Sequence, residues 1–329
     1  MKQLKMGFLA LVLFMAACQK NTTTSKETEL ESTESTPIAQ RCASQEVLEQ
    51  QMAADPGLRQ RREAIEAHTQ QVLSNRSHRL MNDGTIEIPV VVHVIYRTAD
   101  ENISTAQVES QIAVLNEDFT NTNLDSTKAN SSRFGDFNTN VGIRFTLKEI
   151  IRIPSSKRSW STNDDMKFTS KGGSNTVDPQ NNLNMWVVNK MTSYGSTILG
   201  YAQFPGGAWA TDGVVIAHNY FGRIGKVSAP YHLGRTATHE VGHWINLRHI
   251  WGDATCGNDL VEDTPQHNTS NGGCPSSEHK STCTGTPYEM WMNYMDYTYD
   301  ECMYMFTHKQ KDRMRAVFAS GAFRAAMAQ

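Results

Sequence analysis

The chain has 329 residues, of which 39% are hydrophobic and 20% are charged, and its formal net charge is −3. These values are ordinary for a globular protein, and a slightly acidic chain gives no electrostatic reason to expect a nucleic-acid partner. The length fits either two domains or a single core preceded by a pro-segment.

The N-terminus is typical of an export signal. Lys2 and Lys5 precede an apolar run that is too short to span a membrane and ends in small residues before Cys18, so we predict a signal peptide over residues 1–17. This pattern resembles a bacterial lipoprotein signal, which implies acylation of Cys18 and membrane contact through that lipid alone; an ordinary secretory signal is the alternative. Residues 18–37 are rich in Ser, Thr, Glu and Lys, which predicts a flexible tether. The protein would be anchored at the cell envelope or released outside the cell.

Residues 38–80 carry helical patterns and are predicted to form a pro-segment. Ser44–Ala54 fits one helix with Ser44 as its N-cap, and Asp55–Leu73 fits a second helix that opens with an Asp-Pro pair. The polar, arginine-containing stretch Ser74–Asp83 then follows. It would serve as a cleavable link to the core that follows.

Strand and helix patterns fill the core that follows. Ile86–Tyr96 is almost continuously apolar and β-branched, which is typical of a buried strand, and Ser104–Phe119 has apolar residues at helical spacing behind a serine cap. Four more strands, a second long helix and a closing helix are expected at Gly142–Ile153, Asn184–Val188, Leu199–Phe204, Gly213–His218, Gly234–Leu247 and Lys309–Met327. This order indicates an α+β fold with a twisted, mixed sheet of five strands and two long helices.

The segment from His239 to His249 reads HExxH followed by a third histidine. On a helix His239 and His243 share one face, whereas His249 reaches the same point only if the helix ends and the chain turns. Three imidazoles leave zinc an open position, which is typical of a catalytic site. Glu240 would then take a proton from the attacking water and deliver it to the leaving amine. A surface helix with scattered histidines is the alternative.

A second motif, Asn293–Tyr297 (NYMDY), lies downstream. The two segments HEVGHWINLRHIWGD and NYMDY closely resemble the pappalysin family of metzincin metallopeptidases, and the resemblance runs from about residue 86 to the C-terminus. It implies a metzincin-like zincin, with a catalytic subdomain over 81–249 above an irregular, disulfide-stapled subdomain over 250–329. Metzincins usually have glycine where this chain has Asn246. Because asparagine is the best substitute for glycine in the left-handed conformation, we expect the turn toward the third histidine to form.

The resemblance also suggests roles for residues around the zinc. Met295 would form a packed floor beneath the ligands, because a thioether is a poor zinc ligand. Tyr297 matches a metzincin tyrosine that can swing toward the site and donate to a tetrahedral intermediate; a core aromatic is the alternative. An edge strand with free amides can pair with a substrate, which we expect of the upper-rim stretch Gly200, Tyr201, Ala202 and Gln203; a plain edge strand is compatible with this.

Four of the six cysteines lie in the C-terminal part and fit two disulfides, for which the sequence allows three pairings. The pappalysin resemblance favours Cys256 with Cys283 and Cys274 with Cys302. If Cys18 is acylated, this leaves Cys42 as the odd cysteine.

Cys42 follows Arg41 at the head of the pro-segment, and the stretch resembles the cysteine switch of latent metzincins. A Cys42 thiolate would occupy the open position of the zinc in the latent form. Arg41 would keep the sulfur ionised and grip acidic groups in the cleft. A free or intermolecularly paired thiol is the alternative.

An acidic loop follows the third histidine. Its hard oxygen ligands suggest calcium, which relatives in the family bind in this half of the molecule, and a solvated polar loop is the alternative. The tentative calcium ligands are Asp253, Thr255, Asp259 and Asp263.

Together these features predict a monomeric, exported zinc endopeptidase that acts on proteins or peptides and is made as a zymogen. Relatives in the family often cut before a basic residue, which implies self-maturation before Arg76 or Arg79. The rival hypothesis is a non-catalytic surface lipoprotein, a binding module that kept the fold. The intact histidines, Glu240 and Tyr297 argue against it.

Overall fold

The computed structural model describes residues 40–75, 84–193, 195–285 and 287–328. The predicted signal peptide, the tether with Cys18 and the bonds before Arg76 and Arg79 lie outside these residues. Pro37–Gln329 forms one compact unit. Within the described ranges, no helix is both long and apolar enough to cross a membrane.

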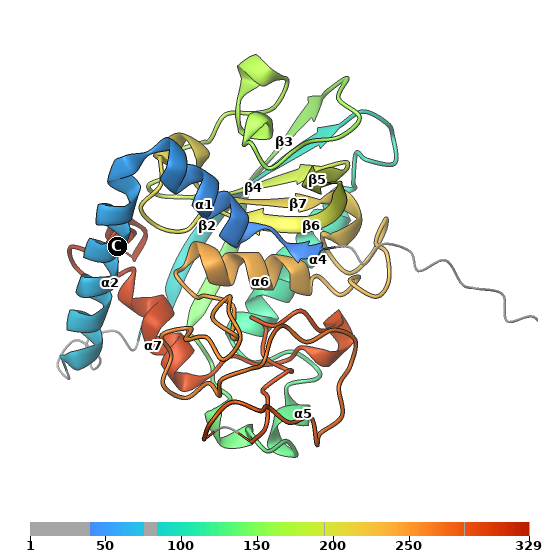
Figure 1. Ribbon diagram of the computed structural model, residues 1–329. Coiled ribbons are helices and arrows are strands. Elements are labelled where there is room, and N and C mark those ends of the chain that lie inside the picture. The colour runs from blue at the N-terminus through green and yellow to red at the C-terminus, as the bar shows by residue number, and fades with distance from the viewer. Residues whose placement is uncertain (1–39, 76–83, 194, 286, 329) are drawn as a thin grey trace, which may run out of the picture. The chain divides into compact units, whose positions relative to one another are not determined.

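A mixed sheet organises the catalytic half of the molecule (Figure 1). Its strands are β1 (Gln40–Cys42), β2 (Ile86–Tyr96), β3 (Ile143–Pro154), β4 (Leu183–Val188), β5 (Met191–Ser193), β6 (Ser196–Ala202) and β7 (Val214–Ala217). The order is β1-β6-β7-β4-β2-β3, with β5 paired to β6. The sheet is parallel from β7 through β4 and β2 to β3, whereas β6 runs antiparallel to β7.

The α+β class and the five predicted strands are confirmed, but the sheet has seven strands where the sequence predicted five. The two additional strands, β1 and β5, have three residues each, so they are too short to carry a recognisable alternation of side chains. β1 lies in the predicted pro-segment, which was expected to be helical only. It is a strand because its backbone pairs with the edge of β6.

Two helices pack on one face of this sheet. α4 (Thr105–Phe119) begins at Ser104, whose side chain accepts a hydrogen bond from the amide of Gln107, as predicted. α6 (Arg235–Trp244) packs beside it. The apolar side chains of β2 that belong to the same core are fully buried: Ile88, Val90, Val92 and Val94. Their burial removes enough apolar surface from water to hold the helix layer against the sheet.

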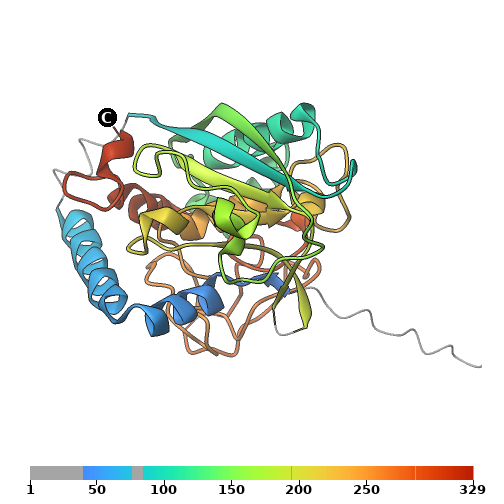
Figure 2. The same cartoon turned by 90° about the horizontal axis from the view of Figure 1, so that it is seen from above.

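The other α-helices within the described ranges are α1 (Ser44–Ala54), α2 (Pro56–Ser74), α5 (Thr127–Asn130) and α7 (His308–Ala316). The two helices predicted for the pro-segment are confirmed as α1 and α2. Figure 2 shows both of them, in blue, along the outside of the core. Ser44, however, does not cap α1 as predicted, because its side chain bonds elsewhere.

The helix that carries the histidine motif is shorter than predicted and ends at Trp244. Asn246 takes a left-handed conformation with φ of 79°, as the sequence predicted for this position. The amide of Leu247 then donates to the carbonyl of Gly242, which closes the turn. This reversal directs the following chain back toward the helix.

The closing helix is also shorter than the predicted Lys309–Met327. α7 starts with a capping box at Thr307, ends at Ala316 and is followed by turns and a short 3-10 helix, Ala325–Ala328. A continuous helix to residue 327 is also excluded by Gly321, which has φ of 78°.

The lower half of the molecule is irregular. Between α6 and α7, the described residues contain no secondary structure longer than the 3-10 helix Asp300–Cys302. Two disulfides staple this region, and they join the pairs that the family resemblance favoured, Cys256 with Cys283 and Cys274 with Cys302.

A buried ion pair ties the C-terminal segment to the end of α6. The guanidinium of Arg324 binds both carboxylate oxygens of Asp212 at 2.8 and 2.9 Å, and both side chains are fully buried. Arg324 also donates to the carbonyl of Trp244, the last residue of α6, and the indole of Trp244 donates to Asp212. The last residue of α6 is therefore held by a residue 80 positions downstream.

We predict that Arg324→Ala lowers the free energy of unfolding by about 3–5 kcal/mol, because the Asp212 carboxylate stays buried without its cation. Urea denaturation of the purified precursor measures this. The control is Lys226→Ala, which breaks an ion pair with Asp100 that is exposed on both sides and should leave the midpoint nearly unchanged. Equal shifts in the two variants would contradict the role given to the buried pair.

Candidate active site

Three buried histidines meet at the end of α6. His239 and His243 lie one turn apart on the helix, and the turn at Asn246 brings His249 to them. The Nε2 atom of His243 lies 3.1 Å from Nε2 of His239 and 3.1 Å from Nε2 of His249. The sequence prediction that these three side chains converge is correct.

The other ring nitrogen of each histidine has a fixed partner. Nδ1 of His239 donates to the carbonyl of Tyr294 at 2.7 Å, and Nδ1 of His243 donates to the carbonyl of Leu247 at 2.8 Å. Nδ1 of His249 bonds to the carboxylate of Asp253 at 2.5 Å. These acceptors hold the protons on Nδ1, so the lone pairs on the Nε2 atoms face one another.

This donor set fits a metal ion. Burial and the neighbouring imidazoles lower the pKa of His239 well below its usual value, and that of His243 to about 3, so both rings are neutral. Because each ring's Nδ1 is bonded to its own partner, the three converging Nε2 atoms have no proton to share, and a cation satisfies all of them at once. Three imidazoles whose Nδ1 atoms are bonded to carbonyl or carboxylate groups are typical zinc ligands.

A thiol completes the group. Sγ of Cys42 and the three histidine nitrogens all lie within 4.8 Å of one another, and all four residues are buried. Cys42 lies opposite Gly200 in the β1–β6 pairing, and the amide of Ala43 donates to the Gly200 carbonyl. Burial raises the pKa of the Cys42 thiol, and Glu240 adds to this effect. The strand pairing therefore carries the thiol to the histidines.

Arg41 does not contact the sulfur. Its guanidinium is bound to the carbonyl of Thr298 and lies 3.3 Å from the carboxylate of Asp300, and the side chains of both charged residues are almost completely buried. The ring of Tyr231 covers it at 5.0 Å. Of the two roles predicted for Arg41, the contact with an acidic group in the cleft is present, and support of the thiolate is not.

Glu240 lies in α6 beside the histidines and is fully buried. Its Oε2 accepts a hydrogen bond from the hydroxyl of Ser44 at 2.8 Å and lies 3.3 Å from Sγ of Cys42. Burial raises its pKa to about 8. A Cβ atom on Gly200 would lie 3.0 Å from Cγ of Glu240, so glycine in β6 is what allows the carboxyl to pack against the strand.

The Met-turn lies beneath and beside the histidines. Sδ of Met295 would lie 2.5 Å from a Cβ atom on Gly242, so the methionine packs directly against the helix backbone between the two ligands, as a floor would. The Tyr297 hydroxyl lies 3.1 Å from Nε2 of His249 and 3.2 Å from the Cys42 carbonyl. Both predicted residues are thus at the site.

The edge strand contributes its backbone to the cleft. The Gly200 carbonyl accepts from Ala43, and the Ala202 amide donates to the Ser44 hydroxyl at 2.8 Å. The Tyr201 hydroxyl bonds to Asp164, and the side-chain amide of Gln203 donates to a carbonyl in the following turn. Of the four predicted substrate-binding residues, Gly200 and Ala202 meet the predicted pro-segment through their backbone, and the Gln203 side-chain oxygen accepts from Gln51 of α1 at 3.2 Å.

The four tentative calcium ligands do not form one group. Asp253 is bound to His249, Asp263 accepts from Thr307 and from the amide of residue 309, and Thr255 is exposed. Asp259 accepts from Thr264 and from the amide of residue 261. The loop bends at Asp253, which has φ of 57°, so its carboxylate turns back toward the histidine.

Comparison with known proteins agrees with this geometry. The model of a peptidase family described as Pregnancy-associated plasma protein-A (Peptidase_M43) matches residues 170–319. Extracellular metalloprotease 1 of Coccidioides posadasii is 31% identical, over 71% of this chain and 77% of the relative. An extracellular metalloprotease of Uncinocarpus reesii is 33% identical, over 72% of this chain and 78% of the relative.

Two solved structures match this chain over almost their whole length, which is more than the two metalloprotease relatives do. Mature mirolysin of Tannerella forsythia, in complex with a cleaved peptide, is 44% identical with a TM-score of 0.71, over 75% of this chain and 96% of that one. A promirolysin mutant of the same organism is 42% identical with a TM-score of 0.77, over 88% and 97%. The chain belongs to the pappalysin family of metzincin metalloproteases. As a member of this pappalysin family it is a metalloendopeptidase, and the family implies zinc at the histidine cluster.

For two residues of this site, the sequence analysis predicted contacts that differ from those in the structure. Asp253, predicted as a calcium ligand, orients His249; its place four residues after a histidine ligand is a signal that could have identified it. Ser44, predicted as a helix cap, bridges the Ala202 amide and Glu240. Nothing in the sequence around Ser44 indicates this contact, because it depends on the pairing of β1 with β6.

We predict that Asp253→Asn weakens zinc binding about 10–100-fold, because His249 loses the carboxylate that orients its ring. Zinc retained by the precursor against a competing chelator measures the change. Asp259→Asn, in the same loop but without contact to a histidine ligand, should retain zinc like the unaltered protein. If Asp253→Asn kept its zinc but lost a calcium-dependent gain in stability, Asp253 would be a calcium ligand after all.

Proposed function

We propose that the chain is the precursor of an exported zinc endopeptidase that Cys42 holds inactive. The observation that carries the proposal is the convergence of three buried imidazole nitrogens and one thiol on a single point. Relatives named extracellular metalloproteases support export. A zymogen is supported by the promirolysin structure, which matches 88% of this chain, whereas mature mirolysin matches 75%. The three histidines, Glu240 and Tyr297 are all present, which argues against the rival hypothesis of a non-catalytic surface lipoprotein.

The chain's own residues divide the work of peptide hydrolysis. A zinc ion held by His239, His243 and His249 would activate water and polarise the scissile carbonyl. Glu240, buried beside the same point, would carry a proton from the nucleophile to the leaving amine. The Tyr297 hydroxyl, close to His249, would donate a hydrogen bond to the oxyanion that develops.

We expect Glu240→Ala to keep its zinc and its fold but to lose most of its turnover, by about 10²–10⁴-fold, because the proton carrier is lost while the ligands remain. Tyr297→Phe should lower kcat with little change in KM. Casein hydrolysis and zinc content per chain measure both. The Glu240→Ala precursor should also fail to process itself before Arg76 or Arg79. Turnover equal to that of the unaltered enzyme would reject the assignment.

Latency would rest on two residues of the pro-segment. Cys42, which lies with the three histidines, would occupy the position that a water nucleophile needs, and Ser44 donates to the carboxylate of Glu240. The Ser44 hydroxyl also accepts a hydrogen bond from the Ala202 amide, and a bound substrate would need this amide for strand pairing. The metal position, the proton carrier and the edge strand would therefore all be occupied by one short stretch.

Cys42→Ala should make the precursor active, or speed its maturation, without added protease, because the open metal position becomes free for water. Ser44→Ala should have a smaller effect in the same direction, since the thiol stays in place. Casein hydrolysis by the fresh precursor and the time course of processing distinguish the two. A Cys42→Ala precursor that is as silent and as slow to mature as the original would exclude the switch.

A preference for a basic residue is supported by the place of Arg41. β1 runs parallel to β6, so a substrate in the opposite, antiparallel direction would bring the residue after its scissile bond to the side that Arg41 occupies. There the guanidinium is buried against Asp300, the Thr298 carbonyl and the Tyr231 ring. This pocket fits an arginine of the substrate, and Arg41 would fill it in the precursor.

We expect the mature enzyme to cut peptides with arginine after the scissile bond at least tenfold faster than peptides with neutral citrulline there. Asp300→Asn should reduce this ratio to about two, because the pocket keeps its shape and loses its charge. The ratio of kcat/KM for the two peptides is the readout, since it is insensitive to the amount of active enzyme. An unchanged ratio in Asp300→Asn would rule out this pocket.

The remaining parts of the proposal concern calcium, the lipid and the chain's divisions. Burial raises the pKa of Asp259 to about 6, and no ion pair to this carboxylate is present among the described residues, which supports calcium as the cation that would neutralise it. The proposal also includes lipidation of Cys18, a monomeric state and a pro-segment over residues 38–80. N-terminal sequencing of the mature form tests the bounds of the pro-segment.

A further inference from the structure

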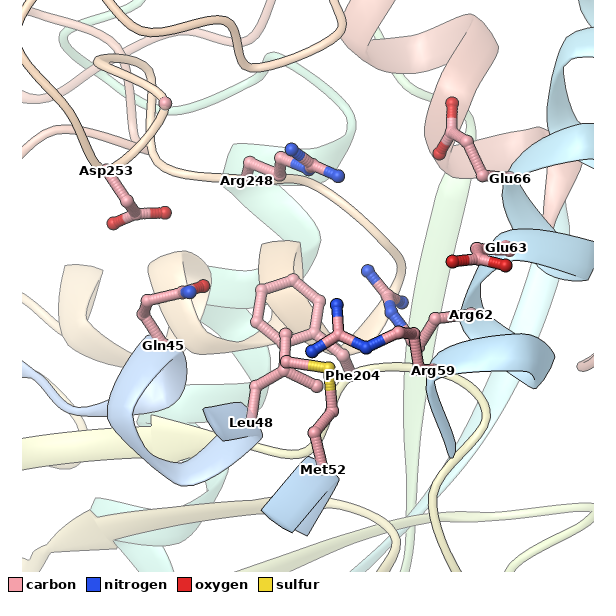
Figure 3. A pocket seen from close by; sticks show the side chains of 11 residues that line it. Gln45, Leu48, Met52, Arg59, Arg62, Glu63, Glu66, Phe204, Arg248 and Asp253 are labelled. Carbon is pink, nitrogen blue, oxygen red and sulfur yellow. The ribbon is translucent and has the colours of Figure 1, made fainter. Parts of the chain in front are cut away.

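A cavity of about 410 Å³ lies between helices α1 and α2 on one side and Phe204, Arg248 and Asp253 on the other. Figure 3 shows its walls: Glu66 and Arg62 extend from α2, whereas Arg248 and Phe204 belong to the catalytic core. The cavity therefore changes when the pro-segment leaves. Its α1 and α2 walls would depart, and the side that carries Arg248 would open to the substrate cleft.

Glu66 is bound at this cavity by a core arginine. Its two carboxylate oxygens lie 3.0 and 2.6 Å from the terminal nitrogens of Arg313, whose side chain is only 1% exposed. Although burial opposes ionisation, Arg313 above all, with Arg248, lowers the pKa of Glu66 to about 2. Nε of Arg313 is committed to the carbonyl of Asn246, so its outer nitrogens are held facing the pro-segment.

Arg248 stands beside this pair without a hydrogen-bond partner among the residues that the structure describes. It is partly buried and lines the cavity. The acidic groups of the core that act on it are already engaged: Asp253 with His249, and Asp259 with Thr264. Glu66 is thus the carboxylate that serves the two arginines, and it belongs to the pro-segment.

We propose that Arg248 and Arg313 form a subsite for a carboxylate of the substrate, and that Glu66 holds its place in the precursor. The ligand is the side chain of an Asp or Glu residue on the amino side of the scissile bond. The side follows from direction: the pro-segment continues from Cys42 past Ala202 into α1 and α2, and an antiparallel substrate would present its residues before the scissile bond there. This inference rests on the proposed endopeptidase function.

The mature enzyme and a set of quenched fluorescent peptides test the subsite. Each peptide has arginine after the scissile bond and a single Glu, or its neutral equivalent Gln, at one of four positions before that bond. At one position the Glu peptide should be cut with a kcat/KM about tenfold higher than the Gln peptide, the size expected for a charge-assisted contact. A Lys at the same position should make the slowest substrate.

Variants then assign the effect to the cavity. Arg248→Gln should reduce the Glu-to-Gln ratio to less than twofold, whereas Arg248→Lys should keep a large part of it. Arg144→Gln, a change at an exposed arginine on β3, is the control and should leave the ratio intact. The ratio should also shrink as salt is raised, because the subsite is partly open to solvent.

The outcomes separate the subsite from the enzyme activity itself. If the mature protein cuts none of the peptides, the endopeptidase function is wrong. If it cuts Glu, Gln and Lys peptides equally at all four positions, the subsite does not exist, a result that needs no variant. If a Glu preference appears but survives in Arg248→Gln, a different group recognises the carboxylate and the assignment is overturned.

Discussion

Three imidazole lone pairs that face one another inside the protein are the constraint on which this structure depends. Neutral nitrogens at 3.1 Å repel unless a cation lies between them, so each ring needs a strong partner on its far side. The Tyr294 carbonyl of the Met-turn serves His239, and the Leu247 carbonyl behind the left-handed turn serves His243. The end of α6, the Met-turn and the loop at Asp253 therefore have the shapes that these hydrogen bonds require.

The proposed pro-segment binds groups that, under the proposed function, a substrate would also meet. Its strand β1 pairs with the edge of β6, and its Ser44 hydroxyl accepts a hydrogen bond from the Ala202 amide. It also buries Arg41 against Asp300 and ties Glu66 to Arg313. Each contact pairs a polar group of the core that would otherwise face the cleft. A segment of modest length can thus bind firmly, since several of its contacts are charged and shielded from water.

The sequence predicted the parts of this site that follow from local spacing. HExxH on a helix, the third histidine and the tolerance of Asn246 for a left-handed turn depend on neighbouring residues, and all three are as predicted. Contacts between distant segments were missed. Ser44 reaches Glu240 only because β1 pairs with β6, and Arg324 reaches Asp212 from the irregular segment that follows the end of α7 at Ala316. Such contacts need the tertiary arrangement, which periodicity does not encode.

The two disulfides of the lower half overlap along the chain, since Cys274 lies inside the loop closed by Cys256 and Cys283, while Cys302 lies beyond it. Every peptide bond between Cys256 and Cys302 is consequently spanned by at least one of the two bridges. A single cut anywhere in this long irregular stretch leaves both pieces covalently joined. One nick in this loop-rich region would therefore not release the Met-turn from the histidine helix.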